Sequence, residues 1–452
     1  MSTRNFILLI IILSLGVIAV FVFLFFRKEP VLPPQDGAGI NFDIPFGGSG
    51  ATKPPATLPP ADISGYEPEP SEETQKAKLV KVSSMPVAGF TVFPKERIKE
   101  INPSPTLPLS GEGVVPPDKG GLGGLKKPAK SLTEFAPNLR YTAKENGNIY
   151  QSFADKIKEE KFSGTIIPKV YDAYFGNRGE SVIMRYLKID DRTIETFVGT
   201  LPKELLGAEV AGNNEVKGYF LPNNVKDISL SPDGQKIFYM FESENSFGEN
   251  IIGTILNFSN NRKTQIFDSP FTEWLSQWPN NNIITLSTKP SGGASGYMYT
   301  MDSAGKNFGK VLGAIDGLTT LGSPNGKLIL YGDSNLSLNI YHADTRNTDA
   351  LAIRTLPEKC IWGKVSDVVF CAVPKLIGFR QYPDSWYQGE VSFSDQLWKI
   401  DAKTGNATLL ADPATVRGGE EIDGIKLAMD ERENYLFFVN KKDSFLWKLE
   451  LK

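Results

Sequence analysis

The sequence has little of what metal sites and nucleic-acid surfaces require. It contains one histidine, His342, and two cysteines among 452 residues, which excludes a multi-histidine metal site. Lysine and arginine number 49 against 52 acidic residues, so the formal net charge of -3 provides no basic field for phosphate groups. We therefore expect no nucleic-acid binding and no metal ligands.

Signature motifs of catalysis are also missing. Gly292-Gly-Ala-Ser-Gly296 has the wrong spacing for the Gly-x-Ser-x-Gly turn of serine hydrolases. No phosphate-binding loop occurs, and no Gly-x-Gly-x-x-Gly follows a strand-like run. The acidic pairs Asp190-Asp191 and Glu420-Glu421 are typical of solvated turns, and His342 of a hydrogen-bonded structural residue. The sequence predicts neither catalytic residues nor a cofactor.

One long uncharged run lies near the N-terminus. Phe6 to Phe26 is a stretch of 21 residues without a charge, long enough to cross about 30 Å of hydrocarbon as a helix. A cleaved signal peptide is the alternative, but its apolar core is usually about 7 to 15 residues long and ends in small residues. We predict that residues 1–28 form a short tail and a single-pass helix in the cell membrane.

Residues 29–76 are rich in proline and glycine. They include Pro33-Pro34, Pro54-Pro55 and Pro59-Pro60, a composition that cannot bury apolar surface and that predicts a disordered stalk. Positive charges flank the predicted helix on both sides, so they do not decide its orientation. The solvated stalk and the two cysteines favour a chain whose main body lies outside the cytoplasm.

After Asn138 the sequence indicates an all-β fold built from a repeat. Residues 227–240 comprise a strand, a Pro-Asp-Gly turn and a second strand, and two further strand-like runs at 251–258 and 263–267 complete a set of four. The same order returns from Thr319 to Ile353. A period of roughly 40 to 50 residues is typical of propeller blades. The length after Asn138 predicts a seven-bladed β-propeller, with six or eight blades also compatible.

The repeat resembles a known class. Leu230-Ser-Pro-Asp-Gly234 followed by Lys236-Ile-Phe-Tyr239 resembles the TolB-type and WD-like propeller repeat, and Ser323-Pro-Asn-Gly326 is similar to it. As a whole the chain resembles uncharacterised single-span propeller proteins of bacteria with reduced genomes. This resemblance implies a membrane-anchored propeller and implies no activity.

The last repeat ends one strand short. We expect residues 77–83 to supply the missing strand, because closing the ring with both chain ends removes an exposed sheet edge. Residues 86–93 then form the innermost strand of the first blade. The predicted propeller spans residues 77–452, with a Pro- and Gly-rich insertion at about 95–137 that we expect to be disordered.

The two cysteines fall in one predicted hairpin. A turn at Val365-Ser366 places Cys360 opposite Cys371. Opposed residues of antiparallel strands have Cα atoms about 4.5 to 5.5 Å apart, which a disulfide can span. The pair is a disulfide candidate, and two buried thiols are the alternative.

Three connections between second and third strands are long, at residues 242–250, 289–296 and 375–394. The last contains aromatic residues and an arginine, which dominate protein recognition surfaces. Its candidates for partner binding are Phe379, Arg380, Tyr382, Trp386 and Tyr387. Alternatively, this loop folds onto its own aromatic side chains.

The sequence is therefore interpreted as a non-enzymatic scaffold, anchored in the membrane, that binds a protein or an envelope polymer outside the cytoplasm. The alternative is a lactonase-like or quinone-dependent propeller enzyme with its site at the central channel. Such an enzyme needs charged groups that converge on the innermost strands. The runs at 228–230, 320–322 and 426–428 offer few of them.

Overall fold

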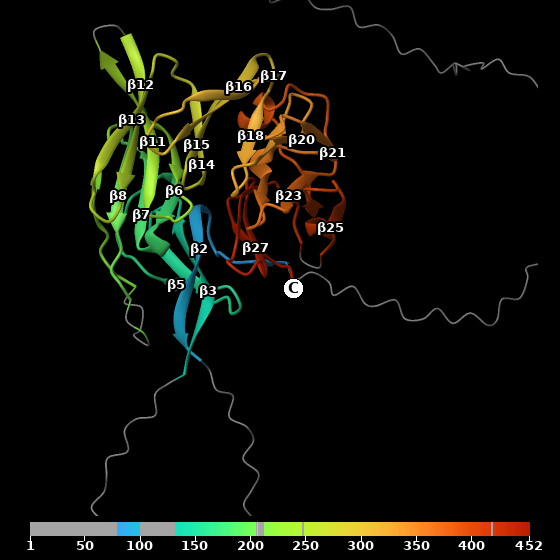
Figure 1. Ribbon diagram of the computed structural model, residues 1–452. Coiled ribbons are helices and arrows are strands. Elements are labelled where there is room, and N and C mark those ends of the chain that lie inside the picture. Colours follow the sequence, from blue (N-terminus) through green and yellow to red (C-terminus); the bar gives the residue numbers. More distant parts are fainter. Residues whose placement is uncertain (1–78, 100–131, 205, 207–211, 246–247, 417–418) are drawn as a thin grey trace, which may run out of the picture. The chain divides into compact units, whose positions relative to one another are not determined.

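The structure is a computed structural model that describes residues 79–99, 132–204, 206, 212–245, 248–416 and 419–452. Seven four-stranded antiparallel sheets follow one another along the chain, and they are arranged around a ring in which β27 returns to the neighbourhood of β2 (Figure 1). The prediction of an all-β, seven-bladed propeller is confirmed.

One strand of each sheet lies at the centre of the ring, where neighbouring blades contact each other. These inner strands are β2 (Val87–Ile98), β6 (Val170–Gly176), β10 (Val225–Leu230), β14 (Trp274–Asn280), β18 (Thr319–Gly322), β22 (Cys360–Trp362) and β26 (Gly424–Met429). The second strands are β3 (Thr133–Ala143), β7 (Ser181–Leu187), β11 (Lys236–Asn245), β15 (Ile283–Thr288), β19 (Leu328–Gly332), β23 (Val368–Pro374) and β27 (Tyr435–Asn440).

The third strands are β4 (Ile149–Phe153), β8 (Ile194–Thr200), β12 (Gly248–Asn257), β16 (Ser295–Asp302), β20 (Ser337–His342), β24 (Asp395–Asp401) and β28 (Leu446–Glu450). The outer strands are β5 (Glu160–Lys161), β9 (Lys217–Phe220), β13 (Lys263–Ser269), β17 (Gly309–Asp316), β21 (Thr348–Arg354), β25 (Ala407–Ala411) and β1 (Leu79–Lys81). Short helices occupy connections: η1 (Asn177–Gly179), η2 (Pro357–Lys359), α2 (Asp384–Tyr387) and η3 (Pro413–Thr415).

The two ends of the described chain meet in one blade. β1 pairs with β28 in antiparallel register, with Leu79 opposite Leu449 and Lys81 opposite Trp447. The backbone N–H of Val82 continues the pairing with a bond to the carbonyl of Leu446. The sheet thus reads β1-β28-β27-β26, which is the pairing expected for the strand within residues 77–83.

The turn that carries the repeat signature is built by its own residues. In Ser231-Pro-Asp-Gly234 the hydroxyl of Ser231 accepts a bond from the N–H of Lys236, and the N–H of Gly234 bonds back to the carbonyl of Ser231. Gly234 has φ 68° and its counterpart Gly326 has φ 72°. This left-handed conformation favours glycine and explains why the turn recurs with glycine in the same place.

The apolar core is divided into layers between adjacent blades. Ile149 and Phe162 of the first blade, for example, pack with Val182 and Met184 of the second. Second strands such as β7 are buried on both faces, whereas outer strands such as β21 alternate exposed and half-buried residues. Runs of apolar residues in the sequence therefore mark the middle of each blade.

Two predicted loops are longer strands in the structure. Residues 95–98, expected to begin a disordered insertion, pair with 133–136 in a hairpin that projects from the ring (Figure 1). Pro94 lies opposite Pro137, so the two residues that lack an N–H disturb the ladder at one position only. Likewise, residues of the predicted loop at 242–250 continue the pairing of β11 and β12. Strand pairing gives their backbone N–H and C=O groups hydrogen-bond partners, and this gain does not depend on the type of side chain.

No helix among the described residues is long and apolar enough to cross a membrane. The predicted helix Phe6–Phe26, the stalk at 29–76 and most of the insertion lie outside the described residues.

We predict that deletion of residues 77–83 lowers the melting temperature by on the order of 10 °C, because the last blade loses its outer strand and the ring its closure. Differential scanning calorimetry of the full chain measures this. A matched deletion of seven residues within the Pro-rich segment, 54–60, is expected to leave the melting temperature unchanged. Equal melting temperatures for both deletions would contradict the closure.

Candidate functional site

Four inner strands are irregular close to the residue at which they begin. The pairing register shifts between Val87 and Gly89 in β2, Val170 and Asp172 in β6, Val225 and Asp227 in β10, and Ile425 and Ala428 in β26. Each shift is a β-bulge, and bulges change the direction of side chains and occur often beside functional sites. These strands belong to blades that are neighbours in the ring.

Lys426 lies within the bulge of β26. Its φ of 52° is left-handed, a conformation that costs energy for a residue other than glycine and that clusters at functional sites. The Lys426 amine donates to Asp172 Oδ1 at 2.6 Å and to the carbonyl of Ala88 at 2.7 Å. The bulge thus directs a cation from the last blade toward the first and second.

Asp172 is the centre of this group. Arg185 Nη1 lies 3.4 Å from Asp172 Oδ2, and Arg185 Nη2 donates to the carbonyl of Val225 at 2.5 Å. Burial alone would raise the pKa of Asp172. The charge and hydrogen bond of Lys426, with smaller contributions from Tyr174 and Arg185, outweigh burial and hold that pKa below its ordinary value of 3.8. Asp172 is therefore ionised at neutral pH.

Asp227 occupies the corresponding position of the next inner strand, but its pKa shifts in the opposite direction. Its Oδ2 accepts bonds from the backbone N–H of Ser276 at 2.7 Å and from the Ser276 hydroxyl at 2.6 Å. Burial raises the pKa of Asp227 above its ordinary value, because these bonds and the charge of Arg185 do not compensate for lost hydration. The charge of Asp172 contributes in the same direction. We call Asp172, Arg185, Asp227 and Lys426 the central cluster.

A side pocket of about 470 Å³ lies beside the central cluster. Its walls include Met85, Ala143, Lys144, Val170 and Tyr171. Tyr171 and Lys144 connect the side pocket to the central cluster. The Arg185 guanidinium lies 5.3 Å from the centre of the Tyr171 ring. The pKa of Lys144 is lowered first by burial and second by the charge of Lys426. The side pocket gives the central cluster an adjoining cavity.

A second acidic group lies on η2, which contacts β26 and β18. The Tyr387 hydroxyl donates to Glu358, and burial raises the pKa of Glu358. Tyr387 is thus one of the predicted partner-binding residues that reaches a titratable group near the inner strands. Its side chain is 39% exposed.

The rest of the predicted partner-binding group divides into buried and exposed members. Tyr382 and Trp386 are 3% and 4% exposed and pack with Phe393 and Leu336. Phe379 is fully exposed, and Arg380 donates only to the neighbouring carbonyl of Phe379. The loop at 375–394 thus packs Tyr382 and Trp386 inside and leaves Phe379, Arg380 and Tyr387 at least partly exposed, and partner binding by these residues stays a prediction.

A buried ion pair holds this loop against the ring. Lys359 is completely buried and bonds to Asp395 Oδ2 at 2.7 Å and to Asp423. Asp423 Oδ2 also accepts from the indole N–H of Trp386 at 3.0 Å and from the N–H of Phe393 at 3.1 Å. Burial raises the pKa of Asp395 to about 6, although Lys359 opposes the shift. Trp386 is buried because its one polar atom has a carboxylate partner.

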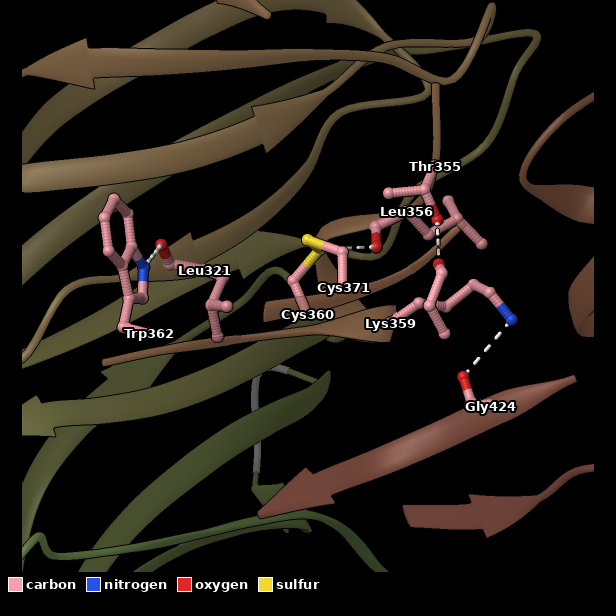
Figure 2. The surroundings of a disulfide bond; sticks show 9 residues. Leu321, Thr355, Leu356, Lys359, Cys360, Trp362, Cys371 and Gly424 are labelled. Atoms are coloured by element: carbon pink, nitrogen blue, oxygen red, sulfur yellow. Dashed lines mark hydrogen bonds between the residues drawn. A yellow bond between two sulfur atoms is a disulfide. The ribbon is translucent and has the colours of Figure 1, made fainter. Parts of the chain in front are cut away.

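The register predicted for the cysteines is confirmed. Cys360 lies opposite Cys371 in the pairing of β22 with β23, their Cα atoms are 4.1 Å apart, and a disulfide joins them. Figure 2 shows the disulfide with Trp362 on one side and Lys359 on the other. Trp362 donates to the carbonyl of Leu321, and Lys359 donates to the carbonyl of Gly424. Both cysteines are buried. Neither belongs to the central cluster.

The described residues contain no group of three or more histidine, cysteine or acidic side chains placed to hold a metal ion. His342, the single histidine, bonds to Asp349 Oδ2 at 2.8 Å between the third and outer strands of its blade. What the central cluster can perform is proton transfer, since it holds two carboxyl groups whose pKa values are displaced in opposite directions.

Comparisons with known proteins assign no family to the chain. No protein-family model and no curated protein sequence matches the chain. Among solved structures, oligogalacturonate lyase from Vibrio parahaemolyticus is similar with a TM-score of 0.47 and 8% identity, over 70% of this chain and 86% of that one. An oligogalacturonate lyase in complex with manganese has a TM-score of 0.48 and 11% identity over the same shares. Such identities assign neither activity nor substrate to this chain.

The structure contradicts the ground on which the chain was interpreted as a non-enzymatic scaffold. Nothing in the comparisons supports a scaffold role. The premise taken from the sequence is also wrong, because the innermost strands do carry converging charges in Asp172, Asp227 and Lys426. The runs considered in the sequence began after Asp227 and left out the strand of Asp172, and they included Lys426 without its partner.

A signal for these residues is present in the sequence. Val170-Tyr-Asp172 and Val225-Lys-Asp227 share valine and aspartate at the same spacing, and both open an inner strand. In the two preceding blades of the ring, Val87-Ala-Gly89 opens β2, and Ile425-Lys426 follows the first residue of β26. An alignment of strand starts would have brought out the acidic pair.

We predict that Trp386→Ala lowers the free energy of unfolding by about 3 to 5 kcal/mol, because it empties a buried site and removes one of the donors to Asp423. Phe379→Ala in the same loop removes a fully exposed ring and should change it by less than about 0.5 kcal/mol. Chemical denaturation compares the two variants. Similar losses in both would show that the loop is not packed as described.

For the cysteines, thiol titration of the unreduced, denatured protein should find no free thiol. The paired variant Cys360→Ser with Cys371→Ser should lose about 3 kcal/mol of stability, because the unfolded chain gains the freedom that the disulfide removed. Two reactive thiols in the unreduced protein would contradict the bond.

Proposed function

We propose that this chain is an enzyme that carries out general acid–base chemistry, such as hydrolysis or elimination, at the centre of the propeller. One observation carries the proposal: Asp172 and Asp227 hold the same position on adjacent inner strands, and their pKa values shift in opposite directions. A pair of carboxyl groups divided in this way supplies a base and an acid at the same pH.

Each group has a role in this proposal. Asp172, ionised by Lys426 and Arg185, accepts a proton from the substrate or from an attacking water. Asp227, which keeps its proton to a higher pH, returns a proton to the leaving group. Lys426 and Arg185 stabilise the negative charge that develops in the transition state. Their fixed bonds to the carbonyls of Ala88 and Val225 hold both cations in place.

We further infer that the propeller belongs to the TolB-type class and is anchored in the membrane. The turns at Ser231 to Gly234 and Ser323 to Gly326 support the first inference. The uncharged run from Phe6 to Phe26 supports the second, and the Pro-rich residues 29–76 would keep the ring away from the bilayer, outside the cytoplasm.

The proposal is tested by turnover of the full chain in detergent on three probes: 4-nitrophenyl esters, small lactones and polygalacturonate. On a probe that is turned over, Asp172→Asn and Asp227→Asn should each lower kcat at least 100-fold. Asp191→Asn, an exposed aspartate of the same blade as Asp172 that pairs with Lys169, should retain wild-type kcat.

The pH dependence gives a second readout. Turnover should rise as Asp172 loses its proton below pH 3.8, and fall as Asp227 loses its proton above that value. In Asp227→Asn the alkaline limb should disappear from the residual activity. Failure of the wild type on all three probes, or variants as active as Asp191→Asn, would count against the proposal.

A further inference from the structure

The wall of the side pocket combines apolar and cationic surface. Met85, Ala143, Val170 and Tyr171 contribute apolar atoms, and Lys144 contributes an amine on the side of the central cluster. The volume of about 470 Å³ is in the range of sites for small molecules. Among the described residues, Glu145 and Lys169 also line it, and Lys169 pairs with Asp191.

Among the described cations of this region, Lys144 has no carboxylate partner. Lys426 and Arg185 pair with Asp172, Lys169 pairs with Asp191, and Glu145 also belongs to the wall. The Lys144 amine donates to a neutral group, the hydroxyl of Ser444, at 2.9 Å. Because burial and the nearby Lys426 disfavour its charge, the pKa of Lys144 is lowered. A bound anion would relieve that repulsion.

Both amines also retain unused donors. An ammonium group has three N–H donors. Lys144 directs one to Ser444, and Lys426 directs two to Asp172 and Ala88. The remaining donors can serve a ligand without breaking the bonds that hold the blades together.

We infer that the side pocket binds a ligand in which an anionic group is joined to an apolar group. The anion lies against Lys144, where the charge of the neighbouring Lys426 adds to the attraction, and the apolar part contacts Val170 and the ring of Tyr171. The inference deepens the proposed function and rests on it where this ligand is the substrate. In that case the bound anion places the reacting part of the molecule next to Asp172.

Ligand-observed NMR with the full chain in detergent tests this with three probes. Benzoate has both features, benzamide has the ring without the charge, and acetate has the charge without the ring. We expect benzoate to bind at least tenfold more tightly than either of the others. Equal affinity of benzoate and benzamide would overturn the inference, as would equal affinity of benzoate and acetate.

Two variants locate the binding. Lys144→Met keeps the aliphatic stem and should reduce the affinity for benzoate to that for benzamide. Lys169→Met is the matched control, since Lys169 lines the same pocket but is paired with Asp191, and it should change the affinity less than twofold. Melting temperatures equal to the wild type show that both variants are folded. The inference fails if the two variants bind benzoate equally well.

The binding result is independent of turnover. If benzoate binds no more tightly than benzamide or acetate while kcat still depends on Asp172 and Asp227, the ligand class is refuted and the proposed function stands. Specific binding of benzoate with no dependence of turnover on the two aspartates would refute the proposed function instead.

Discussion

Polar bonds between neighbouring blades at the centre of the ring are the constraint on which the rest of the structure depends. Apolar layers hold the blades face to face, but the inner strands are positioned by side chains that reach the backbone or side chains of the next blade. Such bonds join Lys426 to Ala88, Arg185 to Val225, Ser276 to Asp227, Gln277 to Thr320, Trp362 to Leu321 and Lys359 to Gly424. Between the first and second blades the backbones themselves meet, since a Cβ on Gly89 would lie 1.9 Å from the carbonyl oxygen of Ala173.

The same bonds place charges where chemistry can use them. A buried or half-buried ion costs desolvation energy unless it is paired, and Asp172 of the second blade is paired with Lys426 of the last blade and with Arg185 of its own. Their arrangement is incomplete at Lys144, whose partner is a hydroxyl. By contrast, Lys359 is enclosed by Asp395 and Asp423 with no exposed surface. The first group is thus suited to a ligand, and the second to holding the aromatic loop.

Local patterns in the sequence predict much of the fold and little of the site. The Pro-Asp-Gly turn, the opposition of Cys360 and Cys371 and the strand near Leu79 follow from turn chemistry, strand spacing and the missing fourth strand. The pairing of Lys426 with Asp172 joins residues 254 positions apart and depends on bulges that change the direction of side chains. The burial of Trp386 depends on Asp423 in another blade. Residue types alone could not distinguish a recognition loop from a packed one.

The central claim is that Asp172 and Asp227 differ in protonation because of their surroundings. Titration of the aspartate side-chain carboxyl signals by carbon NMR, assigned with Asp172→Asn and Asp227→Asn, measures this directly. The account predicts that Asp172 titrates below its ordinary value of 3.8 and Asp227 above it. Two aspartates that both titrate near 3.8, or in the reverse order, would contradict it.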